Sequence, residues 1–152
     1  MAIPISRGWH IAAGCMTFFI WGNSLVPGTG SSHLSLSVVS MLRSWLSGMG
    51  LPSVFLTNLL VRKTAHFSEY ALLSVMVHNA FAEDSKLPIR RFAVMCVIPV
   101  LVASVDETIQ HFVPGRCGTP ADVLIDCCGA AFGILVCLMA RRVSRRVKTR
   151  HR

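Results

Sequence analysis

ADVLIDCCGAAFGILVCLMA, residues Ala121–Ala140, is a run of twenty residues in which only Asp122 and Asp126 are charged. A bilayer core about 30 Å thick needs about 20 mainly apolar residues in one helix. The run ends at Arg141, where a strongly basic tail begins. We therefore predict that this stretch is a transmembrane helix.

The composition of the whole chain has the same character. Of its 152 residues, 53% are hydrophobic and 14% are charged, whereas soluble domains carry about 25% charged residues. This composition disfavours a water-soluble globule, and it excludes intrinsic disorder, which requires low hydrophobicity with high charge. The length suits one domain over residues 1–152.

Three further stretches are candidates for spans, at residues 92–109, 9–26 and 65–82. The last is unusual because it contains His66, Glu69, Tyr70 and His78. We predict an all-α, polytopic membrane protein with four transmembrane helices. For residues 9–26 a cleaved signal peptide is the alternative, because Arg7 precedes the apolar run.

Residues 31–47 differ from the predicted spans because serines interrupt the apolar residues at regular intervals. Leu34, Val38 and Trp45 share one side of a helix, whereas Ser40 and Ser44 occupy other angles. This pattern predicts an amphipathic helix in the membrane interface. A re-entrant segment over residues 31–52 is the alternative.

The net charge of +8 is unevenly distributed along the chain. Seven of the fifteen Lys and Arg residues lie in the tail at 141–152, so the rest of the chain is close to neutral. With four spans, eleven of the fifteen fall on the side of the two termini and four on the other side. The positive-inside rule then predicts cytoplasmic termini, and the tail indicates topology rather than binding of nucleic acid.

This orientation brings polar residues from three segments to the outer face of the membrane. Arg62, His66 and Glu69 are spaced i, i+4 and i+7 and share a helix face. The full set is Arg62, Lys63, His66, Glu69, Tyr70, Asp106, Glu107, Gln110, His111, Arg116, Asp122 and Asp126. Its three cations and five acids can bind a phosphate and a divalent metal, or they can form a closed ion-pair network that only holds the helices together.

The two aspartates of the last span have different surroundings. Thr119-Pro120-Ala121-Asp122 is typical of a helix start, with an N-cap threonine and an acidic third residue, which is a sufficient structural role for Asp122. Asp126 lies one turn deeper, on the face that continues through the G-x-x-x-G of Gly129 and Gly133. Because that motif lets a partner helix approach closely, we expect Asp126 to face a neighbouring helix.

The end of the third span carries four polar groups, Asp106, Glu107, Gln110 and His111. They cover too wide an arc of a helix to face one neighbour. At least one of them is therefore expected to face water or lipid headgroups, and the spacing does not identify which. The chain has no H-E-x-x-H or C-x-x-C motif, so no motif predicts a metal.

Two strings of the chain closely resemble the VanZ-like family of bacterial membrane proteins, which is named for a teicoplanin-resistance protein. They are RKTAHFSEYALLS at 62–74 and SVDETIQHFVPGRCGTPADVLIDCCGAAFG at 104–133. Gly118-Thr119 is a mild variation on the family pattern. The resemblance implies a multi-pass protein of the bacterial cytoplasmic membrane, part of the cell envelope, with an association with low-level glycopeptide resistance.

The resemblance also implies activity on phosphate esters of membrane lipids or lipid-linked wall precursors. Together with the outward-facing polar set, it predicts an enzyme that hydrolyses a lipid phosphoester or transfers a headgroup at the outer leaflet. The alternative is a membrane protein that binds such a lipid or precursor without catalysis. The sequence identifies no cofactor, although the acids can hold a divalent cation.

The roles expected in the enzyme follow from residue chemistry. Arg62 and Arg116 hold the phosphate, with Lys63 as an auxiliary contact. His66 or His111 acts as nucleophile or general acid and base, because imidazole titrates near working pH. Glu69, Asp106 and Asp126 orient the histidine or hold a cation. Four residues support this set: Tyr70, Glu107, Gln110 and Asp122.

Overall fold

The computed structural model describes residues 5–81 and 88–150, and these form five α-helices and no strand. The helices are α1 (Ile5–Leu25), α2 (Gly28–Gly48), α3 (Asn58–Ala80), α4 (Pro88–Phe112) and α5 (Pro120–Arg150). The all-α prediction is confirmed. Residues 82–87, which include Lys86 and lie at the junction of the predicted spans 65–82 and 92–109, are outside the described residues.

Two of these helices are long and apolar enough to cross a membrane by themselves, over Phe92–Phe112 and Pro120–Ser144. Helices α1 and α2 meet the same criterion only as a pair, which is bent by 107°. Helix α3 does not meet it, because polar residues such as Lys63, His66 and Glu69 lower its mean hydropathy. The described residues therefore hold two candidate spans, or three if the bent pair is one span, and the count of four stays a prediction.

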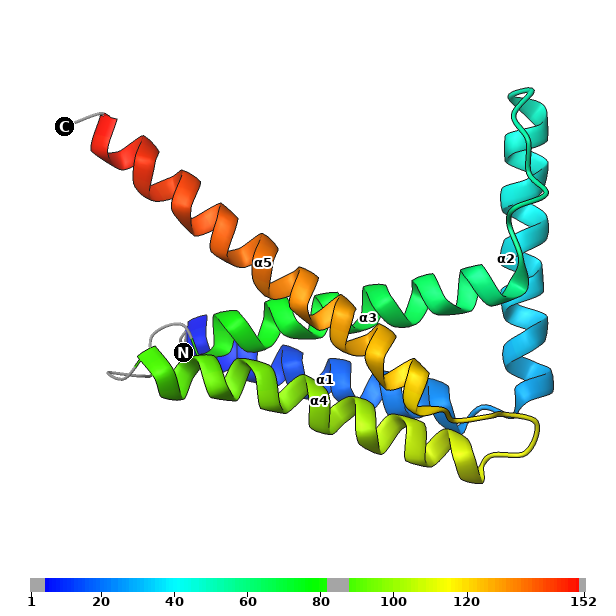
Figure 1. Ribbon diagram of the computed structural model, residues 1–152, viewed down its shortest axis with the longest axis horizontal. Coiled ribbons are helices and arrows are strands. Elements are labelled where there is room, and N and C mark those ends of the chain that lie inside the picture. Colours follow the sequence, from blue (N-terminus) through cyan, green and yellow to red (C-terminus); the bar gives the residue numbers. More distant parts are fainter. Residues whose placement is uncertain (1–4, 82–87, 151–152) are drawn as a thin grey trace.

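Helix α3 is the centre of the assembly, because it packs against all four other helices. Helices α1, α3 and α4 run side by side, α5 crosses α3 obliquely, and α2 stands nearly perpendicular to this bundle (Figure 1). The buried core between α1, α3 and α4 includes Ile20, Tyr70, Leu73 and Ala103. The polar residues of the predicted site lie at the end of the bundle where α3 and α5 begin.

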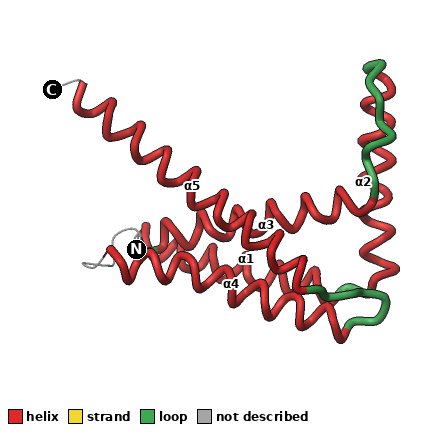
Figure 2. Tube along the Cα trace, in the orientation of Figure 1, coloured by secondary structure: helices red, strands yellow, loops and turns green. Residues whose placement is uncertain are grey.

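The segment after α2 returns along that helix before α3 starts (Figure 2). Gly50 adopts a positive φ of 71° at the turn. The Arg43 guanidinium then donates two hydrogen bonds to the Leu56 carbonyl, at 2.7 and 3.1 Å. Because the returning segment is tied to α2 in this way, it brings the chain back beside the middle of α2, where Thr57 caps α3 (Figure 2).

Helices α3 and α5 approach each other through glycine. A Cβ atom added to Gly129 would overlap the Phe67 carbonyl oxygen, and one added to Gly133 would overlap the Ala71 carbonyl oxygen. The G-x-x-x-G face of α5 is therefore in backbone contact with α3, as small residues allow in membrane helices. Asp126, on the same face, is fully buried.

The loop between α4 and α5 holds the corner between α1 and α2. The Gly28 amide donates to the Pro114 carbonyl at 3.0 Å. Gly115 has a positive φ of 75°, and its backbone leaves no room for a side chain on Gly28. The loop ends where the Asp122 amide donates to the Thr119 hydroxyl at 3.3 Å, which confirms the predicted cap of α5.

We expect Gly129→Ala to destabilise the protein by about 1–3 kcal/mol, because the added methyl must separate two backbones in contact. The measurement is the thermal unfolding midpoint of the purified protein in detergent. Gly14→Ala on α1 is the matched control, since nothing lies within 4 Å of the added Cβ. Equal midpoints for the two variants would contradict the close packing of α3 and α5.

Candidate functional site

The predicted polar residues converge where α1 and α4 end and α3 and α5 begin (Figure 1). His66 comes from the third turn of α3, Asp106 and Glu107 from the last two turns of α4, and Asp126 from the second turn of α5. One donor atom from each of these four residues lies within 4.8 Å of the others. We call these four residues the acid–histidine cluster.

His66 is placed between two aspartates. Its Nδ1 atom lies 3.6 Å from Asp126 Oδ1 and 3.9 Å from Asp106 Oδ2. These separations exceed the length of a hydrogen bond, and His66 Nδ1 has no hydrogen-bond partner in the structure. The imidazole therefore faces both carboxylates without a direct bond to either.

The aspartates of the cluster are buried and incompletely bonded. Asp106 and Asp126 both have 0% relative exposure. Neither Asp126 oxygen has a hydrogen-bond partner, and Asp106 Oδ1 and the neighbouring Tyr70 hydroxyl also lack one. Among the described residues, no Lys or Arg lies within ion-pair distance of these two aspartates. Such burial of carboxylates costs several kcal/mol per ion when nothing compensates it.

Glu107 and Gln110 form a second layer behind the aspartates. The Gln110 amide donates to Asp106 Oδ2 and to Glu107 Oε1, each at 3.2 Å. The Thr119 amide donates to Glu107 Oε2 at 2.8 Å. These bonds orient both carboxylates of α4 and join the cluster to the loop that precedes α5.

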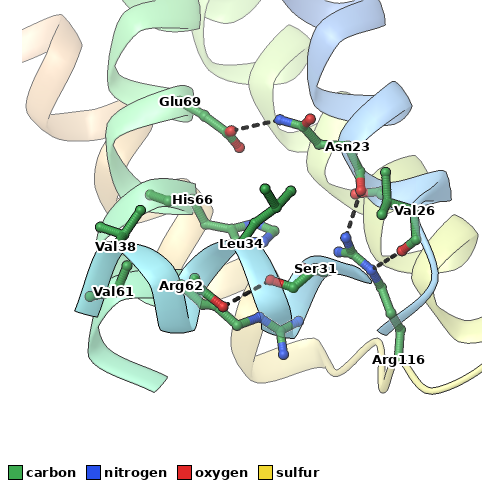
Figure 3. Close-up of a pocket in the computed structure, with 13 residues that line it drawn as sticks. Asn23, Val26, Ser31, Leu34, Val38, Val61, Arg62, His66, Glu69 and Arg116 are labelled. Atoms are coloured by element: carbon green, nitrogen blue, oxygen red, sulfur yellow. Dashed lines mark hydrogen bonds between the residues drawn. The ribbon is translucent and has the colours of Figure 1, made fainter. Parts of the chain in front are cut away.

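A pocket of about 280 Å³ opens beside the cluster, between α2, α3 and the end of α1. Its polar lining includes Arg62, His66, Glu69 and Arg116. Figure 3 shows the two guanidinium groups on one side of this pocket and Glu69 on the other. The apolar part of the lining consists of Val26, Leu34, Val38, Val61 and Ala65.

The two arginines of the pocket have different surroundings. Arg116 donates to the Val26 carbonyl at 2.8 Å and to the Asn23 carbonyl at 2.6 Å, so it binds the end of α1. The guanidinium of Arg62 has no hydrogen-bond or ion-pair partner in residues 5–81 and 88–150. Burial and the nearby Arg62 lower the pKa of Arg116 from its ordinary value, but arginine stays protonated. Two like charges thus share one pocket wall.

Residues of α1 and α2 that the sequence did not single out complete the pocket. The Asn23 amide donates to Glu69 Oε1 at 3.1 Å, as drawn in Figure 3. Ser24, fully buried beside Asp106, and Ser31 and Ser35 of α2 also line it. The signal that could have identified Asn23 and Ser24 is a pair of polar residues at the end of an apolar run.

Other predicted site residues lie apart from the cluster. Lys63 forms an ion pair with Asp122, which joins α3 to the start of α5. His111 is exposed and packs edge to face on Phe112, with ring centroids 5.5 Å apart. His111 is thus the member of the α4 polar group that faces outward, whereas Asp106, Glu107 and Gln110 are buried.

The VanZ/LLP1 family matches residues 9–141, which is most of the chain. The chain belongs to this family. Searches of curated proteins and of solved structures find no match. The family match extends beyond the two strings at 62–74 and 104–133 that carry the resemblance, and it includes α2 and most of α1.

The VanZ-like strings now have physical roles in this chain. Residues 114–116 hydrogen-bond to the backbone at the corner between α1 and α2. Gly118 packs against the Glu107 carbonyl with no room for a side chain. The G-x-x-x-G sets the α3–α5 distance. In this member of the VanZ/LLP1 family, the motif residues therefore position the cluster and the pocket together.

We expect Arg116→Lys to lower stability by about 2 kcal/mol, because an ammonium cannot hold the Asn23 and Val26 carbonyls in the same forked geometry. Thermal unfolding in detergent measures this loss. Arg62→Lys is the control within the same pocket and should change stability by less than about 0.5 kcal/mol. A similar loss in both variants would argue against a distinct role of Arg116 at the corner.

Proposed function

We propose that this VanZ-like protein acts at the outer leaflet of the bacterial cytoplasmic membrane on a phosphoester of a lipid or of a lipid-linked wall precursor. The observation that carries the proposal is the pocket in which Arg62 and Arg116 lie beside His66, with five apolar residues in the same lining. A phosphate with an attached lipid chain has both of the properties that this lining complements.

The membrane arrangement that we propose has α1, α3, α4 and α5 as spans and α2 in the interface. Helices α1 and α3 pack alongside α4, which is apolar enough to span. Helix α2 turns away from α1 by 107°, and Leu34 and Trp45 on its apolar side are 69% and 72% exposed. Such a face is stable when it lies against lipid.

In this arrangement the basic end of α5 is cytoplasmic and the pocket lies at the outer interface. The positive-inside count supports this orientation. The pocket is then at the depth of the lipid phosphates, and its apolar residues on α2 and α3 lie toward the acyl region. Arg62, which has no partner among the described residues, is the group best placed to bind the phosphate.

His66 joins the pocket to the buried acids, and we assign to it proton transfer at the phosphoester. In hydrolysis, the oxygen of water bonds to phosphorus and the bond from phosphorus to the leaving oxygen breaks. The proton lost by water is balanced by one delivered to the leaving alcohol. By changing a lipid-linked wall precursor in this way, the protein would reduce susceptibility to teicoplanin.

We expect His66→Ala to abolish the change in lipid composition that expression of the intact protein causes. Comparative mass spectrometry of membrane lipids, with and without the protein, measures the change. His111→Ala is the matched control and should keep the effect, because His111 lies outside the cluster. Indistinguishable lipid profiles with and without intact protein would overturn the enzymatic proposal.

A non-catalytic role predicts a different outcome in a purified system. An enzyme converts many equivalents of a phosphate-bearing lipid, whereas a binding protein retains about one equivalent without product. In both cases Arg62→Ala should weaken retention of the lipid about tenfold or more, because a charged hydrogen bond to phosphate contributes about 1.5–3 kcal/mol. Unchanged retention of the lipid by Arg62→Ala would show that Arg62 does not bind the phosphate.

The proposed topology is tested by cysteine labelling. Cys117 is exposed in the loop between α4 and α5, so we expect a membrane-impermeant maleimide to label it in intact spheroplasts. In a variant that lacks Cys117 and carries Ser144→Cys at the basic end of α5, labelling should require permeabilisation. The reverse pattern would invert the orientation.

A further inference from the structure

We propose that the acid–histidine cluster is a binding site for one divalent transition-metal ion, with His66 Nδ1, Asp106 and Asp126 as its protein ligands and Glu107 at its edge. The four residues come from three helices that are far apart in the sequence. Their donor atoms nevertheless lie within 4.8 Å of one another.

The unpartnered atoms of the cluster point to a ligand. Three aspartate oxygens and His66 Nδ1 are buried without a hydrogen-bond partner. Buried polar atoms are bonded in the great majority of cases, and exceptions call for a missing water or ion. A divalent cation would satisfy these atoms and offset the charge of the carboxylates, which no nearby Lys or Arg does in the described part of the chain.

The distances within the cluster fit a shared ion better than direct bonds. Two donors that are each about 2.1 Å from one ion lie between about 3.0 and 4.2 Å apart, depending on the angle at the metal. His66 Nδ1 lies 3.6 and 3.9 Å from the two aspartates, inside that interval. These separations are too long for hydrogen bonds.

The donor set selects the class of ion. Carboxylates suit Mg²⁺, Ca²⁺ and Mn²⁺, whereas imidazole suits Zn²⁺, Fe²⁺ and Cu²⁺. One imidazole with two or three carboxylates therefore fits Mn²⁺, Fe²⁺ or Zn²⁺ better than an all-oxygen ion. Gln110 and the Thr119 amide, which orient Asp106 and Glu107, act as the outer layer that holds such ligands in place.

This inference deepens the proposed function, but the metal site can be tested without any lipid. With the ion on Nδ1, the Nε2 atom of His66 keeps its proton and can donate it in a hydrogen bond to a phosphoester oxygen. A water on the ion would then supply the nucleophile, because a bound metal lowers the pKa of its water. The buried acids and the arginine pocket thereby become two parts of one site.

The experiment is equilibrium dialysis of the purified, chelator-treated chain in detergent against Mn²⁺ or Zn²⁺ alone, with the bound metal measured by elemental analysis. We expect one ion per chain, and an affinity lower by about tenfold or more in Asp126→Asn, since even loss of outer-layer groups costs 10–100-fold. Asp122→Asn, a carboxylate on the same helix that is paired with Lys63, is the matched control and should bind normally.

Spin-echo spectroscopy of the Mn²⁺-loaded wild type provides a second measurement that no variant's folding affects. A coupling to imidazole nitrogen supports the site. Absence of that coupling, or equal metal binding by Asp126→Asn and wild type, would overturn the proposal. Metal binding without any effect on lipids would support the metal site and reject the proposed function. Lipid turnover by chelator-treated protein would support the proposed function and reject a role of the metal in it.

Discussion

The acid–histidine cluster and the pocket beside it depend on the contact between the backbones of α3 and α5. At Gly129 and Gly133 the two helices are so close that a single methyl group would meet a carbonyl oxygen. Dispersion forces drive such contacts in lipid, where helix association gains little from the hydrophobic effect. Asp126 lies one turn before Gly129, so this contact also brings its carboxylate to the His66 side of α3.

Much of this architecture could be predicted from local patterns in the sequence. The spacing of Arg62, His66 and Glu69 placed all three on one face of α3, and all three line the pocket. The glycine motif indicated that Asp126 faces a packed neighbour, and Asp126 is buried. Periodicity within one helix carries such information because a helix rotates about 100° per residue.

Contacts between distant segments could not be predicted in the same way. No pattern identified α3 as the partner of the glycine face, or distinguished the buried Asp106 from the exposed His111 on one helix end. The pocket wall formed by α2 was also missed, because it depends on the 107° bend after α1. The number of spans is equally hard to predict from α3, because half-buried polar residues such as His66 and Glu69 lower its mean hydropathy and the sequence does not show what they face.

The hydrogen bonds of Arg116 to the backbone also fix the position of its guanidinium in the pocket. A guanidinium has five N–H donors, and two of the Arg116 nitrogens are held by the Val26 and Asn23 carbonyls. Its side chain is therefore ordered before any anion enters, whereas the unpartnered Arg62 must lose rotamer freedom on binding. In the proposed function, Arg116 would therefore set the orientation of a bound phosphate, and the more mobile Arg62 would adapt to headgroups of different size.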